Sequence, residues 1–152
     1  MELSEETKQK IIDEYDSWVD KQYVGKTRAE RDALGAFFTP PEVTIKMLEG
    51  YNLTKDLKES TILDPTIGAG GLIAACIIAG ADPKKCYGNE YDLDILNSCK
   101  ERLCAMGVPG ENLHQGDANF SECVSLSSFT KDYSWDEIQI KHGLKEAAVN
   151  LW

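Results

Sequence analysis

The amino-acid sequence predicts an α/β fold in which a parallel sheet of four or five strands is flanked by helices. Two observations carry this prediction. Short apolar segments that end in acidic or glycine residues alternate with longer segments of helical periodicity. In addition, a glycine-rich turn at residues 64–71 joins the short apolar segment 61–63 to the apolar run 72–79. A strand, a glycine-rich turn and a helix in this order are typical of sheets that bind a ligand at the carboxyl ends of their strands.

The first 34 residues are predicted to form a helical extension ahead of the sheet domain, which we place at residues 35–152. Residues 4–23 carry apolar side chains at helical spacing, with acidic side chains on the opposite face. Thr27 and Glu30 have the spacing of a capping box, so a second, short helix is expected to end near Gly35. The first helix is expected to pack on the sheet domain or on a partner. Its inward residues are Ile11, Tyr15, Trp18, Val19 and Tyr23.

The glycine-rich turn reads Asp-Pro-Thr-Ile-Gly-Ala-Gly-Gly at residues 64–71. Its glycines let the backbone turn sharply and approach a ligand, and the helix that follows presents unpaired N–H groups. A phosphate-binding loop would need Lys-Ser or Lys-Thr after its last glycine, and a dinucleotide loop would read Gly-x-Gly-x-x-Gly. The turn matches neither pattern. Asp64, at the end of the preceding strand, favours a cationic or amino-bearing ligand.

Two further acidic residues are predicted to end neighbouring strands. Glu90 follows the second strand, and an acidic residue about 20 positions past a glycine loop commonly binds ribose hydroxyls. Tyr91 beside it is either a stacking partner for an adenine ring or a residue at the rim. Asp117 ends a third strand near residues 112–117, after a crossover helix that begins at Asp92. Acidic residues at three successive strand ends fit an adenosine with a charged tail.

Four segments, taken in order, resemble successive motifs of the S-adenosylmethionine-dependent adenine-N6 DNA methyltransferases. The greatest likeness is to the modification subunit of type I restriction systems. The segments are Gly-Ala-Phe-Phe-Thr-Pro-Pro-Glu-Val at 35–43, Ile-Leu-Asp-Pro-Thr-Ile-Gly-Ala-Gly-Gly at 62–71, Gly-Asn-Glu-Tyr-Asp at 88–92 and Gly-Asp-Ala at 116–118. The resemblance implies a Rossmann-like class I methyltransferase sheet and S-adenosylmethionine as the cofactor.

The resemblance also implies a role for each motif. The Phe-Phe-Thr-Pro segment closes over the methionine end of the cofactor, and the Asp-Pro loop holds its amino acid moiety. The acid after the second strand binds the ribose, and the aspartate after the third strand contacts the adenine. The cofactor-binding residues implied in this way are Phe38, Thr39, Pro40, Asp64, Pro65, Thr66, Gly68, Gly70, Glu90, Tyr91 and Asp117.

The segment from Thr39 to Glu42 has a second interpretation. A threonine at the N-cap, a proline at the first helical position and a glutamate three residues after the threonine make a capping box. Such a box would open a helix that ends near Gly50. The residues expected to face inward on that helix are Val43, Met47, Leu48 and Tyr51. Capping does not account for the adjacent Phe37 and Phe38, which can line a pocket.

The sequence departs from the family at its catalytic motif. The family carries an Asn/Asp/Ser-Pro-Pro-aromatic motif after its fourth strand, which holds the amino group of the flipped base. The expected fourth strand, at residues 135–140, runs into Lys-His-Gly-Leu, and no proline follows Pro109. We therefore assign no catalytic residue and expect the chain alone not to methylate adenine.

Three functions remain open on this basis. The first is the cofactor-binding part of an adenine-N6 DNA methyltransferase that needs a methyltransferase or specificity subunit for methyl transfer. The second is a catalytically silent relative that interferes with restriction and modification. The third is a small-molecule enzyme that acts on S-adenosylmethionine itself.

The composition bears on the partners and the location of the chain. The net charge is −10 over 152 residues, so binding to DNA is expected only through a partner, because affinity for phosphates comes largely from lysine and arginine. The five cysteines and two histidines show no metal-binding spacing, and reduced thiols are expected. The sequence has no signal peptide and no apolar run of 18 residues. These features predict a cytoplasmic protein with no membrane contact.

Overall fold

The computed structural model describes residues 2–35, 38–50 and 56–116. Within these ranges the chain forms an α/β structure with five α-helices and a three-stranded parallel sheet. The strands are β1 (Ile62–Asp64), β2 (Cys86–Glu90) and β3 (Leu113–Gln115), in the spatial order β1-β2-β3. The predicted α/β class and the first three strands are thus confirmed. The expected fourth strand at 135–140 lies outside the described residues.

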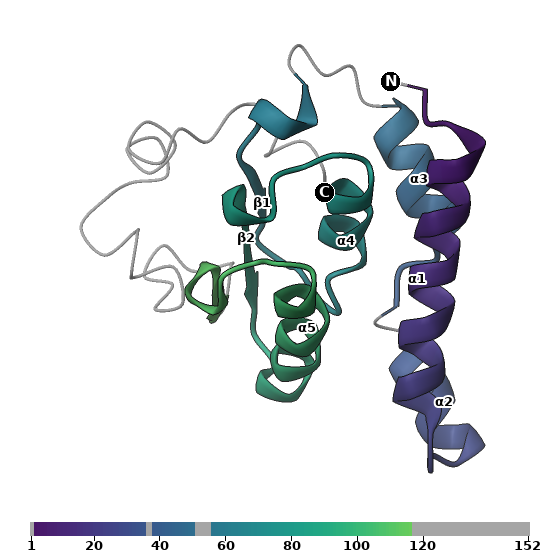
Figure 1. Ribbon diagram of the computed structural model, residues 1–152. Helices are drawn as coiled ribbons and strands as arrows, with labels where there is room; N and C mark the ends of the chain where they lie inside the picture. Colours follow the sequence, from purple (N-terminus) through teal and green to yellow (C-terminus); the bar gives the residue numbers. More distant parts are fainter. Residues whose placement is uncertain (1, 36–37, 51–55, 117–152) are drawn as a thin grey trace.

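The helices form two layers beside the sheet (Figure 1). Helices α4 (Gly71–Ile78) and α5 (Leu93–Ala105) pack against the strands. Helices α1 (Glu5–Tyr23) and α3 (Pro41–Gly50) lie side by side and contact α4 on its side away from the sheet. The short helix α2 (Arg28–Gly35) follows α1. All three strands point the same way, so their carboxyl ends lie at one edge of the sheet.

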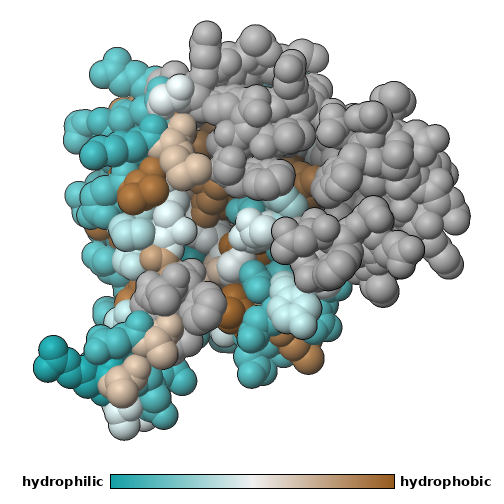
Figure 2. Space-filling view, turned by 180° about the vertical axis from the view of Figure 1, so that it is seen from behind, coloured by the Kyte–Doolittle hydropathy of each residue, from teal (hydrophilic) through white to brown (hydrophobic). Residues whose placement is uncertain are grey.

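Helix α1 confirms the predicted amphipathic helix almost residue for residue. The Ser4 hydroxyl accepts a hydrogen bond from the Thr7 N–H at 3.1 Å and caps the first turn. Ile11 and Trp18 are buried, and the other predicted inward residues are partly buried. Hydrophilic side chains cover the outer edge of the molecule at α1, which lies on the left of Figure 2.

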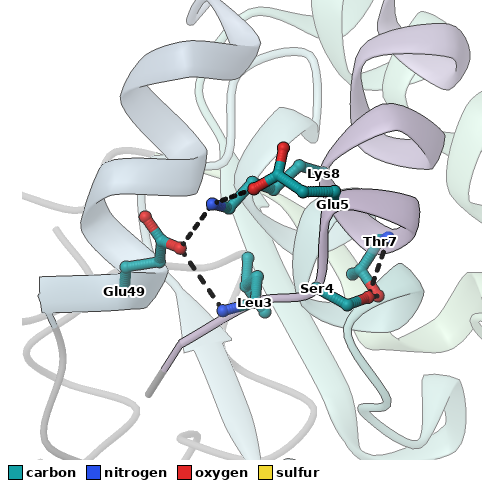
Figure 3. A network of polar contacts seen from close by, with 6 residues as sticks. All are labelled: Leu3, Ser4, Glu5, Thr7, Lys8 and Glu49. Atoms are coloured by element: carbon teal, nitrogen blue, oxygen red, sulfur yellow. Dashed lines mark hydrogen bonds and ion pairs between the residues drawn. The ribbon is translucent and has the colours of Figure 1, made fainter.

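The amino-terminal end of α1 is attached to α3 by polar contacts (Figure 3). The Glu49 carboxylate accepts a hydrogen bond from the Leu3 N–H at 3.3 Å and lies 3.1 Å from the Lys8 ammonium. These side chains are partly exposed, so the ion pair contributes little to stability. The core beneath them is continuous across the predicted division at residue 34. It includes Leu3 and Ile11 from one side and Leu48, Ile62, Ile73, Leu96 and Leu103 from the other.

The capping box expected at Thr39 would start the helix at Pro40, but the helix starts one residue later. Helix α3 begins at Pro41, and the Pro40 carbonyl accepts the first helical N–H groups. Val43 was expected to face inward but is 44% exposed. The buried face instead includes Thr44, because its hydroxyl is satisfied locally by donating to the Pro41 carbonyl at 2.9 Å. Leu48 is buried as predicted, Met47 is partly buried against the core, and Tyr51 lies outside the described residues. The other buried residues of the helix are Pro41, Thr44 and Ile45.

The expected crossover helix is confirmed as α5. The Asp92 carboxylate accepts hydrogen bonds from the N–H groups of Asp94 and Ile95 and caps the helix. Gly107 follows its end with a φ of +100°. No helix in the described part of the chain combines the length and the apolar character needed to cross a membrane.

Candidate functional site

A cavity of about 340 Å³ lies at the carboxyl ends of β1 and β2. Its walls come from the end of each strand, from the glycine-rich loop, and from helices α1, α3 and α5 with the segment just before α3. This volume lies at the lower end of the range that small-molecule sites occupy. The lining residues are Tyr15, Phe38, Thr39, Met47, Asp64, Thr66, Ile67, Gly68, Ala69, Gly71, Leu72, Glu90 and Arg102.

Asp64 places a buried carboxylate in the wall of this cavity. It ends β1 and is only 6% exposed. Burial raises the pKa of Asp64 to about 6. The hydrogen bond from the Thr66 N–H, at 3.1 Å, opposes this rise, and the nearby Glu90 carboxylate adds to it. A cation that entered the cavity would favour the ionised form of this group.

The glycine-rich loop depends on backbone conformations that other residues rarely adopt. Gly68 and Gly70 have φ angles of +55° and +82°. A Cβ atom added to Gly70 would lie 3.0 Å from both Cys99 Sγ and Leu103 Cδ1 on α5. Gly70 therefore sets the close approach of the loop to α5, and it is also the residue before the first turn of α4.

Glu90, at the end of β2, is hydrogen-bonded to this loop. Its Oε2 accepts a hydrogen bond from the Gly68 N–H at 3.0 Å, and its Oε1 accepts one from the Asp92 N–H at 3.0 Å. A carboxylate has about four acceptor positions, so Glu90 keeps acceptor capacity for a ligand in the cavity.

The two residues before Glu90 bring the strand ends together, and sequence reasoning missed both. The Asn89 amide donates to the Pro65 carbonyl at 3.0 Å and to the Gly116 carbonyl at 2.9 Å, so it ties the ends of β1 and β3 to β2. A Cβ atom at Gly88 would clash with the side chain of Ile67, which crosses over β2. A small residue followed by an amide at a strand end is the only sequence signal of this arrangement.

Phe38 lies between the cavity and the Trp18 ring of α1, whereas Tyr15 of α1 lines the cavity itself. Phe38 is buried, and its ring lies 4.6 Å from the Trp18 ring in an edge-on geometry. A second cavity of about 370 Å³ lies on the other side and shares Phe38 and Ala69 as walls. Phe38 and Thr39 are thus part of the site, whereas Phe37, which was expected to line a pocket, lies outside the described residues. Trp18 of α1 packs against Phe38.

Arg102 is a further residue of the site that sequence reasoning missed. It is 7% exposed, on the inward face of α5, and donates to the Ala69 carbonyl at 3.0 Å. Its Nε and Nη2 atoms each donate to the Glu14 carboxylate of α1 at 2.6 Å. The usable signal was an arginine that lies three residues after the inward Cys99 in an amphipathic helix.

The structure brings together some of the predicted cofactor residues and separates others. Of the eleven, Pro40, Pro65, Gly70 and Tyr91 lie outside the cavity wall, and Tyr91 is 71% exposed. Asp117 lies outside the described residues. The predicted residues that do line the cavity are Phe38, Thr39, Asp64, Thr66, Gly68 and Glu90.

The cavity combines two carboxylates with apolar side chains, a lining that can accommodate a ligand with cationic and apolar parts. The guanidinium of Arg102 is already paired with Glu14, so Asp64 and Glu90 are the charges left for a ligand. The lining contains no histidine or cysteine to act as a base or nucleophile. Among the described residues, no three acidic, histidine or cysteine side chains are grouped as a metal site would require.

Comparisons with protein-family models, with curated proteins and with solved structures found no match for this chain.

Proposed function

We propose that the cavity at the carboxyl ends of β1 and β2 binds S-adenosylmethionine or its demethylated product. The observation that carries this proposal is the convergence of three segments on one cavity. Three segments far apart in the sequence each contribute residues that the resemblance assigns to the cofactor and that line this cavity. These residues are Phe38, Thr39, Asp64, Thr66, Gly68 and Glu90. The all-parallel order β1-β2-β3 supports a Rossmann-like class I methyltransferase sheet.

The charges of the cavity suit this cofactor. S-adenosylmethionine carries a positive sulfonium and a positive ammonium group, and the cavity offers the carboxylates of Asp64 and Glu90. Opposite charges attract more strongly in a site from which water is partly excluded. Phe38 and Leu72 supply apolar surface for the remainder of the ligand. The remaining acceptor positions of Glu90 suit the ribose hydroxyls.

The protein class we propose is an adenine-N6 DNA methyltransferase-like chain that transfers methyl groups only with a partner. The 152 residues hold Pro-Pro only at Pro40 and Pro41, so the group that would position the target amino nitrogen must come from elsewhere. The net charge of −10 supports contact with DNA through a methyltransferase or specificity subunit. Such a role is a cytoplasmic one.

The test is an incubation of the purified chain with S-adenosylmethionine that is labelled on its methyl group, with and without DNA. Equilibrium dialysis measures bound cofactor, chromatography measures breakdown, and precipitation measures label on DNA. We expect bound and intact cofactor and no label on DNA. No binding would overturn the proposal, breakdown would favour a small-molecule enzyme, and label on DNA would overturn the need for a partner.

A further inference from the structure

We infer that Arg102 is a positioning residue that couples helix α1 to the glycine-rich loop of the proposed cofactor cavity. Its guanidinium touches both sides at once. Nη1 donates to the Ala69 carbonyl of the loop at 3.0 Å, while Nε and Nη2 donate to the two Glu14 oxygens at 2.6 Å. One buried side chain therefore connects α1 to the loop.

The loop contains one internal backbone turn, in which the Gly70 N–H donates to the Ile67 carbonyl at 2.9 Å, and side chains hold the peptide groups beside it. Ala69 lies between Gly68 and Gly70, two glycines with positive φ, and glycine has more accessible conformations than any other residue. The Gly68 N–H is held by Glu90 on the β2 side. The Ala69 carbonyl is held by Arg102 on the α5 side. Glu90 at the end of β2 and Arg102 on α5 thus hold two peptide groups of the loop, 67–68 and 69–70, with one peptide group between them.

Helix α1 in turn determines where the guanidinium lies. The fork of two hydrogen bonds from Arg102 to Glu14 fixes its plane, and the Trp18 ring lies 4.5 Å from its central carbon. Arg102 is 7% exposed, so the loss of Glu14 would leave a buried charge without its counter-ion. A lysine could not replace the arginine, because an ammonium cannot make the planar fork and reach Ala69 together.

The consequence is that α1, which also lines the cavity through Tyr15, restrains the glycine-rich loop through Arg102. When α1 is docked, Arg102 holds the Ala69 carbonyl and the loop keeps the shape that lines the cavity. When Glu14 is removed, the loop gains freedom and a ligand must order it on binding. The effect on ligand affinity rests on the proposed function, whereas the effect on the loop does not.

A second ion pair on the same helix provides the matched control. Lys8 and Glu49 join α1 to α3 at 3.1 Å, near the amino terminus of the helix (Figure 3). Neither side chain lines the cavity. Glu49→Gln therefore weakens an attachment of α1 without touching Arg102, and Glu14→Gln removes the charge that holds Arg102.

The experiment is amide hydrogen exchange on the full chain, with the thermal unfolding midpoint of each variant measured alongside. We expect Glu14→Gln to speed exchange at residues 66–72 by about tenfold, while Glu49→Gln leaves these amides within about twofold of the parent. Glu14→Asp keeps the charge and should restore part of the protection, which makes it the variant to use if Glu14→Gln does not fold. Arg102→Lys should speed exchange at residues 66–72 as Glu14→Gln does, because an ammonium cannot hold both Glu14 and Ala69.

Two results would overturn the inference. One is loop exchange that is unchanged in Glu14→Gln. The other is equal acceleration in Glu14→Gln and Glu49→Gln, which would mean that α1 affects only global stability. If the parent chain binds no S-adenosylmethionine, the proposed function fails while the exchange data still decide the role of Arg102. If the parent does bind it, Glu14→Gln should raise its Kd by about tenfold.

Discussion

The dipeptide Asp-Pro occurs twice in the described part of the chain, and the two copies make the same local turn in different places. At Asp64 the carboxylate accepts a hydrogen bond from the Thr66 N–H at 3.1 Å, two residues on. At Asp82 the carboxylate accepts one from the Lys84 N–H at 3.0 Å, again two residues on. The local chemistry of the two corners is therefore alike.

The corners differ in where the sheet places them. Asp64 ends β1, is 6% exposed and lines the cavity. Asp82 precedes the amino end of β2, is partly exposed and caps the short 3₁₀ helix Pro83–Lys85. A carboxyl end in a parallel sheet collects ligand-binding residues from several strands, and an amino end does not. The local Asp-Pro sequence therefore determines the turn, whereas the position of the corner in the sheet determines whether it lines a site.

Burial of Asp64 makes the stability of the chain depend on pH. Burial raises the pKa of Asp64 from 3.8 to about 6, so the folded chain holds this proton more tightly than the unfolded chain. The contribution of this proton to the free energy of unfolding is full below pH 3.8 and is lost as the pH rises through about 6. The free energy of unfolding falls by about 3 kcal/mol over this pH range. We propose that the chain keeps this buried carboxylate because the ligand needs its charge.

The largest effect is expected when the charge of Asp64 is removed. Asp64→Asn keeps an oxygen for the Thr66 N–H but removes the charge, so we expect the Kd for S-adenosylmethionine to rise about a hundredfold, or about 3 kcal/mol. The same change should raise the free energy of unfolding at pH 7.5. Asp82→Asn is the control and should leave the Kd unchanged. Equal affinities for the two variants in equilibrium dialysis would refute the assignment of Asp64.

The next effect concerns the glycine-rich loop, which follows the Asp64 corner and has no counterpart directly after the Asp82 corner. Gly70→Ala forces a left-handed φ on alanine and places its Cβ 3.0 Å from Leu103 Cδ1, so we expect the free energy of unfolding to fall by about 2 kcal/mol. Gly25 has a similar φ of +73° but open space around it, and Gly25→Ala should cost about 1 kcal/mol. Urea denaturation measures both, and a smaller loss at Gly70 than at Gly25 would contradict the packing argument.

A third effect is the pH dependence of ligand binding. A cationic ligand favours the ionised form of Asp64, so affinity should rise as the pH passes through about 6. About a tenth of the carboxylate is ionised at pH 5, which predicts a Kd about tenfold higher than at pH 7.5. Asp82→Asn should keep this dependence and Asp64→Asn should lose it. A flat profile in the parent chain would show that Asp64 does not meet the charge of the ligand.

The smallest effect is expected when the Asp82 carboxylate, at the second corner, is removed. Asp82→Ala removes the cap of the 3₁₀ helix, and we expect the free energy of unfolding to fall by about 0.5–1 kcal/mol with no change in ligand affinity. Thermal unfolding and dialysis test the two halves of this prediction. A change in affinity would mean that the corners are coupled across β2.

The sequence predicted the elements whose signals are local. Helix α1 follows from its apolar spacing, α5 from its aspartate cap, and the glycine-rich loop from its composition. Asp64 was predicted from its place at the start of the glycine-rich turn, and Glu90 from its spacing after that turn. The inward face of α3 was predicted in part: Leu48 is buried as expected, but Val43 is exposed. Thr44 is buried although it is polar, because a local hydrogen bond satisfies its hydroxyl.

The supporting residues of the site could not be predicted because their partners are distant in the sequence. Arg102 depends on Glu14, which lies 88 positions away, and Asn89 depends on Pro65 and Gly116. Periodicity places such a residue on a face of an element but says nothing of what faces it across the core. The assignment of Tyr91 as a stacking residue stays a prediction, and its exposed side chain is available for it.

The most direct test of the central claim is calorimetric titration of the chain with S-adenosylmethionine at pH 6, in two buffers of different ionisation enthalpy. The difference between the two heats counts the protons released on binding. We expect saturable binding at one site with release of about half a proton, because Asp64 is about half protonated in the free chain at that pH. An absence of saturable binding, or binding without proton release, would contradict it.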